Sequence, residues 1–143
     1  MAVVSTLSNH YKYQCMAGNI DHDSDAFKIA LMDTSFAFNK DSHSVFSDVI
    51  ASEIAASNGY NASGETLLSG ELTEDDANDR GNMTWGNKTW TASGGDFEAT
   101  GAAIIFDDTS SDDTVVGCID FGTNYTVTDG SSLQIQDPVV RLT

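Results

Sequence analysis

Short apolar runs separated by turn-forming residues dominate this sequence and limit the folds open to it. Proline occurs once, at Pro138, whereas Gly, Asn, Asp, Ser and Thr divide the chain into short pieces. Short runs bounded by such residues are typical of β-strands. The predicted strands are Tyr11–Met16, Ala26–Asp33, Thr66–Leu72, Met83–Trp85, Lys88–Ala92, Ala102–Asp107, Thr114–Phe121 and Leu133–Leu142.

Several of these runs alternate with the period of two that places successive side chains on opposite faces of a strand. Phe27, Ile29 and Leu31 share one face of their strand, and Ala102, Ile104 and Phe106 share one face of theirs. Such alternation is typical of strands with one buried face. With 143 residues the chain suits one domain. We therefore expect an all-β, single-domain β-sandwich, of which a jelly roll is one form.

One segment has a different period and predicts the single short helix of the fold. Within "SDVIASEIAA", Ser47 to Ala56, the apolar residues Val49, Ile50 and Ile54 follow near-helical spacing, and Ser47 is a suitable N-cap. Asn58-Gly59 would end the helix or helical turn, since both residues tolerate a positive φ.

The segment "NMTWGNKTW" predicts a β-hairpin. A two-residue turn at Gly86-Asn87 would pair Trp85 with Lys88 and Met83 with Trp90, and would place all four side chains on one face. An exposed pair of tryptophans would suit sugar stacking. We expect burial instead, in the sandwich or in a subunit interface, because large aromatic side chains usually bury most of their surface.

The charge of the chain restricts its partners. Its 22 acidic and 6 basic residues give a formal net charge of −16. Such a field repels nucleic acid and anionic membranes, so we expect neither as a partner. The N-terminal residues lack the pattern of a secretory signal, and no apolar stretch is long enough to span a bilayer. We therefore expect a cytosolic setting during synthesis, in which Cys15 and Cys118 stay reduced.

Three acidic clusters are candidate cation sites, but none has a convincing pattern. Asp21, Asp23 and Asp25 have the first spacings of a calcium loop, yet Ala26 and Met32 stand where an EF-hand needs Gly and Glu. The other two clusters are "FDDTSSDD", with Asp107, Asp108, Asp112 and Asp113, and "LTEDDAND", with Glu74, Asp75, Asp76 and Asp79. Solvated turns explain both, since Asp often bonds its own backbone. We expect no metal and no other cofactor.

Catalytic motifs are absent from the sequence. His10, His22 and His43 lack zinc-ligand spacing, and there is no nucleophile elbow, P-loop or dinucleotide-binding turn. A glycosidase-like pair of carboxylates stays open, because sequence does not say which of the acids meet in space. The expectation is a protein that is not an enzyme.

An ordered series of sequence blocks resembles a family of small structural proteins of tailed bacteriophages. The blocks are "GNIDHDSD" (Gly18 to Asp25), "KIAL" (Lys28 to Leu31), "DSH" (Asp41 to His43), "DVIASE" (Asp48 to Glu53) and "GYNASGETL" (Gly59 to Leu67), followed by "DDANDR", "TWTA", "GAAIIFDD" and "GCIDFG". The resemblance covers nearly the whole chain, and the order and spacing of the blocks carry it. Two departures are Glu65, where the family has a second glycine, and Cys118, where it has a bulkier residue.

The resemblance implies a non-enzymatic virion protein, with a head decoration or cement protein as the first expectation. It implies that the polar loop from Asp33 to Ser44 links two strands and that Val45, Phe46 and Val49 fix the returning chain onto the core. The alternatives are a tail- or fibre-associated module that contacts host glycans, and a free-standing carbohydrate-binding or hydrolytic domain.

In that setting residues 1–10 form an N-terminal arm and residues 11–143 the β-sandwich domain. We expect a homo-oligomer, a trimer above all, because several contacts hold a small subunit to a shell better than one. Its partners would be the major capsid protein or other virion proteins. The candidate interface residues are Met1, Val3, Val4, Leu7, Trp85 and Trp90.

Overall fold

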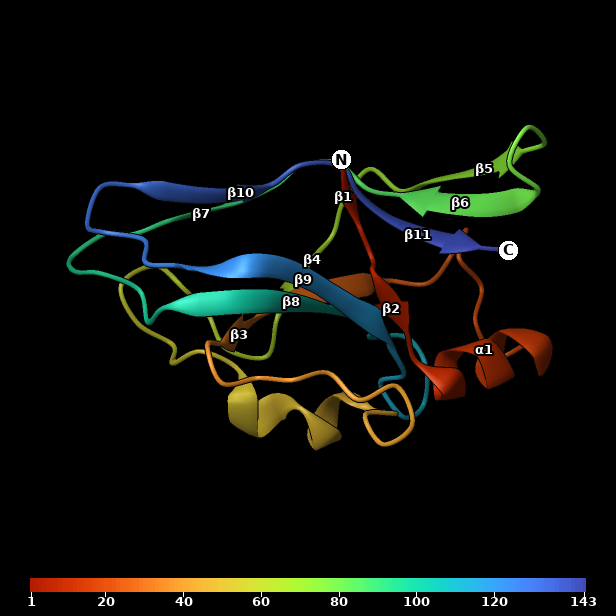
Figure 1. Ribbon diagram of the computed structural model, residues 1–143, viewed down its shortest axis with the longest axis horizontal. Helices are drawn as coiled ribbons and strands as arrows, with labels where there is room; N and C mark the ends of the chain where they lie inside the picture. The colour runs from red at the N-terminus through yellow and green to blue at the C-terminus, as the bar shows by residue number, and fades with distance from the viewer.

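The computed structural model describes residues 1–143, which form β-strands in two stacked layers with one α-helix at the side (Figure 1). The lower sheet has five strands in the order β2-β9-β8-β3-β4, and the upper layer contains a four-stranded sheet, β1-β11-β6-β5, and a two-stranded sheet, β10-β7. The strands are β1 (Ala2–Val3), β2 (Thr6–Leu7), β3 (Phe27–Asp33), β4 (Glu65–Thr66), β5 (Glu71–Asp75), β6 (Arg80–Thr84), β7 (Lys88–Thr91), β8 (Thr100–Asp107), β9 (Val115–Tyr125), β10 (Ser132–Ile135) and β11 (Pro138–Leu142). The predicted all-β, single-domain fold is confirmed.

The space between the two layers holds the main core, a cluster of 21 buried residues. Ile29 and Leu31 of β3 and Ile105 of β8 fill it from below, and Trp85 and Trp90 fill it from above. Phe27 packs against Trp85 with ring centroids 5.1 Å apart. The alternation found in the sequence therefore points these side chains inward, as predicted for a sandwich.

The opposite face of the lower sheet is also buried, which corrects the expectation of one-faced strands. Ala30 and Met32 of β3 belong to a second cluster of nine buried residues that includes Phe46 and Phe106. The chain after β3 folds back beneath the sheet, and Phe46 stacks on Phe106 at 4.1 Å between ring centroids. Phe46 and Val49 thus fix the returning chain onto the core, as expected, although the loop leads into helical turns rather than a strand.

The expected hairpin at Gly86-Asn87 is wrong. β6 pairs with β11 and β5, whereas β7 pairs with β10, so the two strands do not pair with each other. Gly86-Asn87 instead separates β6 from β7, which follow one another along one extended stretch of the chain. Gln136-Asp137 separates β10 from β11 at the same level of the neighbouring stretch. Asn87 accepts a hydrogen bond from the Asp137 N–H (2.9 Å) across the two interruptions. The residues that face the core have odd numbers before the interruption and even numbers after it. Trp85 and Trp90 therefore both face the core.

The predicted strand Tyr11–Met16 is wrong, because these residues lie in the helix α1 (Asn9–Met16). Tyr11 and Gln14, one helical turn apart, are buried, whereas Tyr13 is 65 % exposed. The helix ends at Met16, and Gly18, just beyond the C-cap Ala17, has a φ of +77°, the left-handed conformation common after helix C-termini. None of the helical segments has the length and apolar character that spanning a bilayer requires.

The helix predicted within Ser47–Ala56 is replaced by two 3-10 turns, Phe46–Asp48 and Ile50–Ser52. Glu53 is extended, so the helical conformation ends well before Asn58 and Gly59, although both residues have the expected positive φ. The predicted strand Thr66–Leu72 is also corrected. It is divided between β4 in the lower sheet and β5 in the upper layer because the chain crosses from one layer to the other there.

The N-terminal residues, expected to form an arm, pair with strands of both layers. β1 pairs parallel with β11, and β2 pairs antiparallel with β9. Val4, between them, is buried in the main core. Residues 2–7 therefore connect the upper layer to the lower sheet along one side of the sandwich (Figure 1).

Candidate functional site

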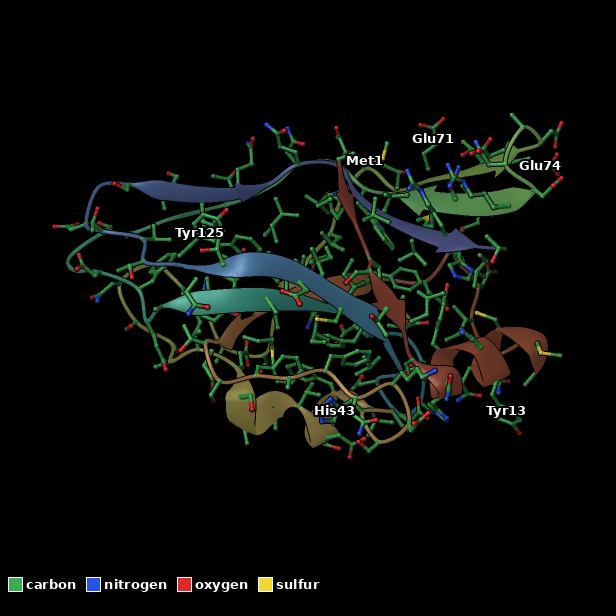
Figure 2. The ribbon with its side chains drawn as sticks, viewed as in Figure 1. Met1, Tyr13, His43, Glu71, Glu74 and Tyr125 are labelled. Carbon is green, nitrogen blue, oxygen red and sulfur yellow. The ribbon has the colours of Figure 1, made fainter.

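An apolar groove opens beside this N-terminal connection, between β9 of the lower sheet and β10 of the upper layer. Its volume is about 380 Å³, and seven of the nine residues that line it are hydrophobic. Figure 2 shows Tyr125 between the ribbons of β9 and β10, and Met1 at the start of β1. The hydrophobic lining consists of Met1, Ala2, Ile119, Phe121, Tyr125, Leu133 and Ile135.

The local sequence of β9 places the aromatic side chains of the groove. Ile119 and Phe121, two residues apart, face the same side of the strand. Beyond them β9 is irregular where it faces β8, and Gly122 has a φ of +70°, with its N–H donating to the Asp120 carboxylate (2.8 Å). The irregularity brings the Tyr125 ring into an edge-to-face contact with Phe121, with centroids 5.9 Å apart. The aromatic lining thus depends on a bulge in β9.

The charge around the groove is acidic at both ends of β10. Asp129 precedes this strand and Asp137 follows it, whereas residues 119–138 contain no Lys or Arg. Near β1 a basic group is present, since Arg141 donates a hydrogen bond to the Met1 sulfur (2.9 Å). The groove is therefore an apolar surface with the basic Arg141 near its β1 end.

The six candidate interface residues differ in how exposed their side chains are. Met1 is exposed and lines the groove, and Val3 and Leu7 are half-buried. Val4, Trp85 (3 % exposed) and Trp90 (1 %) lie in the main core and offer no surface to a partner. The expected burial of the tryptophans is confirmed, which rules out a sugar-stacking platform built from them.

The residues that accompany Met1 in the groove were missed by sequence reasoning. Phe121, Leu133 and Ile135 were assigned to strands but not to a site. One signal was present in the sequence, because β10 combines alternating apolar residues with a complete lack of charge in a chain rich in acids.

A second, more polar hollow lies on the other face of β9. Its volume is about 660 Å³, and its lining includes Thr34, Phe36, Phe38, Asp120 and Asn124. The rings of Phe36 and Phe38 pack against His43, with centroids 5.5 and 5.6 Å away. This hollow offers hydroxyl, amide and carboxylate groups, and a smaller share of its surface is apolar.

The acidic clusters form turns. In the first cluster the Asp25 carboxylate accepts from the Asp21 N–H (2.8 Å), and the Asp21 carboxylate accepts from the Asp23 N–H (3.1 Å). In another, Asp75 accepts from Asn78 and Arg80. No group of three or more His, Cys, Asp or Glu side chains is arranged to hold a metal ion.

Asp107, at the end of β8, is an acid without solvent contact. Its Oδ1 accepts from the N–H groups of Thr109 (2.9 Å) and Ser110 (3.1 Å), whereas its Oδ2 has no donor. Burial, together with the neighbouring Asp25 carboxyl, raises the pKa of Asp107 to about 7. Burial disfavours the charged form and a second carboxylate nearby repels it, so Asp107 favours the protonated form.

The cysteines and histidines form no catalytic constellation with this acid pair. Both thiols are free, and burial raises the pKa of Cys118 to about 12, which opposes thiolate formation. The Tyr11 hydroxyl bonds to His22 Nε2 (2.5 Å), and burial lowers the pKa of His22. His10 bonds to the Asp112 carboxylate at 2.8 Å.

No family model, curated protein or solved structure matches this chain.

Proposed function

We propose that the chain is a non-enzymatic structural subunit of a tailed-phage particle, attached to the outside of the head as a decoration or cement protein. The groove between β9 and β10 is the observation that carries the proposal, because it is a ready surface for another protein. Exposed apolar hollows between polar margins are typical of protein-binding sites. The ordered sequence blocks that resemble phage structural proteins supply the setting.

The charge of the chain agrees with an external position. At a net charge of −16, an inward-facing subunit would be repelled by packaged DNA. The major capsid protein is the proposed partner. The proposal includes several copies of the chain, a trimer above all, at three-fold points of the shell, because linked contacts raise the strength of attachment.

The test uses phage particles that lack the chain, to which purified chain is added. We expect the wild-type chain to bind to heads and to raise the temperature at which DNA is released. The variant Tyr125→Ser should weaken binding by at least about tenfold, because it removes an aromatic side chain from the groove.

Tyr13→Ser is the matched control. It removes an equally large exposed side chain from α1, away from the groove (Figure 2), and should leave binding unchanged. Particles that bind no wild-type chain, or that carry it on the tail in electron micrographs, would contradict the decoration role.

The polar hollow beneath β9 supports a second candidate, a tail- or fibre-associated module that contacts host glycans. Its Thr, Asn and Asp side chains are the kind that hydrogen-bond sugar hydroxyls, and Phe36 and Phe38 add apolar surface. A glycan array would favour this function if the wild-type chain binds saturably and Asn124→Ala does not.

A further inference from the structure

The open edge of β10, beside the groove, indicates how a partner would bind. β10 pairs with β7 on one side, and no strand lies along its other side. We propose that this edge accepts an extended segment of the partner as an added β-strand. The inference rests on the proposed function, since it describes how the same groove would engage the particle.

The backbone of β10 is oriented for such pairing. Ser131 C=O accepts from Ala92 N–H (2.9 Å), toward β7, whereas Gln136 C=O accepts from Ala2 N–H (2.7 Å), on the opposite side. Backbone groups of successive strand residues point to alternate sides. The N–H and C=O of Gln134 therefore face the open edge, where they are available to another strand.

The chain's own N-terminal strand lies along the neighbouring strand β11 on the corresponding side. β1 lies along β11 in parallel register, Ala2 opposite Pro138 and Val3 opposite Val139. Because β10 leads directly into β11, the position beside β10 continues the line of β1 past Met1. A partner strand in this position would lengthen the upper layer by the same hydrogen-bond pattern.

The groove lies directly below that position and would receive alternate side chains of the added strand. Phe121 and Tyr125 form its lower wall, and Leu133 lies on β10 itself. A partner strand with apolar residues at every second position would bury them against these three, while its backbone pairs with Gln134. Strand addition gains affinity from the backbone and specificity from such alternate side chains.

Of the two strands that border the groove, β9 offers the poorer edge for pairing. The β8–β9 register shifts between Thr100 and Ala102, and Gly122 takes a left-handed conformation. Bulges of this kind discourage pairing along an edge. β10 has no register shift against β7.

Charge identifies the chemistry of the partner segment. The chain has a formal net charge of −16, so a segment that carries Lys or Arg outside its apolar positions would be favoured by complementary charge. A second copy of this chain would bring the same net negative charge to the edge and would be repelled. The occupant we propose is therefore a basic, alternately apolar segment of a capsid protein.

The experiment compares Gln134→Pro with Gln134→Thr. Both variants lose the amide that donates to Thr89, but only proline removes the outward N–H. Each variant and the wild-type chain are added to heads that lack the chain. We expect Gln134→Pro to weaken binding by at least about tenfold and Gln134→Thr to retain it.

Hydrogen exchange of the wild-type chain gives a second readout that does not depend on how well the proline variant folds. On binding to heads, the Gln134 amide should exchange at least about tenfold more slowly. The amides of Glu71–Asp75, on the open edge of β5, should exchange at an unchanged rate.

The outcomes separate the two proposals. One outcome is that the wild-type chain binds heads, Gln134→Pro binds equally well, and the exchange rate of the Gln134 amide does not change on binding. The strand-addition inference is then overturned and the proposed function stands. If the wild-type chain does not bind heads, the proposed function fails and this inference with it. Self-association of the isolated chain that Gln134→Pro abolishes would assign the edge to a second copy and also overturn the inference.

Discussion

β5 and β10 both lie at open edges of the upper layer, but the sequence treats the two edges differently. Three of the five residues of β5 are acidic, and Leu72 on this strand is 54 % exposed. β10 carries no charge, and its Leu133 and Ile135 line the groove. Charged side chains prevent unwanted pairing at an edge. The difference agrees with the proposal that β10, unlike β5, is left available for a partner.

The largest expected effect comes from giving β10 the charge of β5. Leu133→Glu should lower the free energy of unfolding by about 2 kcal/mol, because Leu133 packs against the main core and a carboxylate there loses apolar burial. Leu72→Glu on β5 should change it by less than about 0.5 kcal/mol. Urea denaturation followed by tryptophan fluorescence measures both. Equal losses in the two variants would show that the edges do not differ in their contact with the core.

The second prediction compares Asp75, the last residue of β5, with the buried Asp107, the last residue of β8. The pKa of Asp107 in the folded chain is about 7, against an ordinary value of 3.8, so the folded state binds the proton more tightly than the unfolded state. The contribution of Asp107 to stability is therefore complete below about pH 4 and is lost as the pH rises toward about 7. Asp107→Asn resembles the protonated acid and should remove this loss.

Asp75, at the end of β5, has the opposite dependence. Hydrogen bonds from Asn78 and then Arg80 lower its pKa, so its contribution is present above the ordinary value and is lost as the pH falls below it. Unfolding free energies measured from pH 4 to pH 8 test the prediction for Asp107. The exposed Asp76→Asn is the control and should keep the wild-type profile; a wild-type profile in Asp107→Asn would contradict the assignment.

The smallest effect is expected when β5 is made to resemble β10. The double variant Glu71→Thr, Glu74→Thr leaves one acid on the strand and should cause weak, concentration-dependent self-association, with stability changed by less than about 0.5 kcal/mol. Sedimentation velocity measures the association. The variant Asp23→Thr, Asp76→Thr removes the same charge from turns rather than from a strand and should stay as the wild type. If both double variants associate equally, net charge rather than edge protection is responsible.

Sequence patterns found the strands that lie in the middle of the lower sheet. β3, β8 and β9 were recognised because apolar residues alternate over their length, and the core fixes which face each residue takes. The helix α1 was missed because Tyr11, Tyr13 and Cys15 also alternate. Only packing distinguishes the two cases, since Tyr11 is buried and Tyr13 is not. Gly18 was the local signal that a helix ends there.

The candidate site was less predictable than the fold. Met1 was expected at an interface, but its neighbours Phe121 and Leu133 come from strands in different layers. Their meeting depends on the bulge in β9 and on the length of β2, which pairs only with Gly117 and Cys118. Neither feature produces a periodic pattern in the sequence.

By itself, the sequence determined that this protein is an acidic, single-domain β structure with its tryptophans inside. Those properties follow from composition and from the alternation of neighbouring residues, which are local quantities. The tertiary structure decided which strands pair, that the lower sheet is buried on both faces, and that β10 is left with an open edge above a groove. These depend on contacts between residues far apart in the chain, whose free energies no single segment contains.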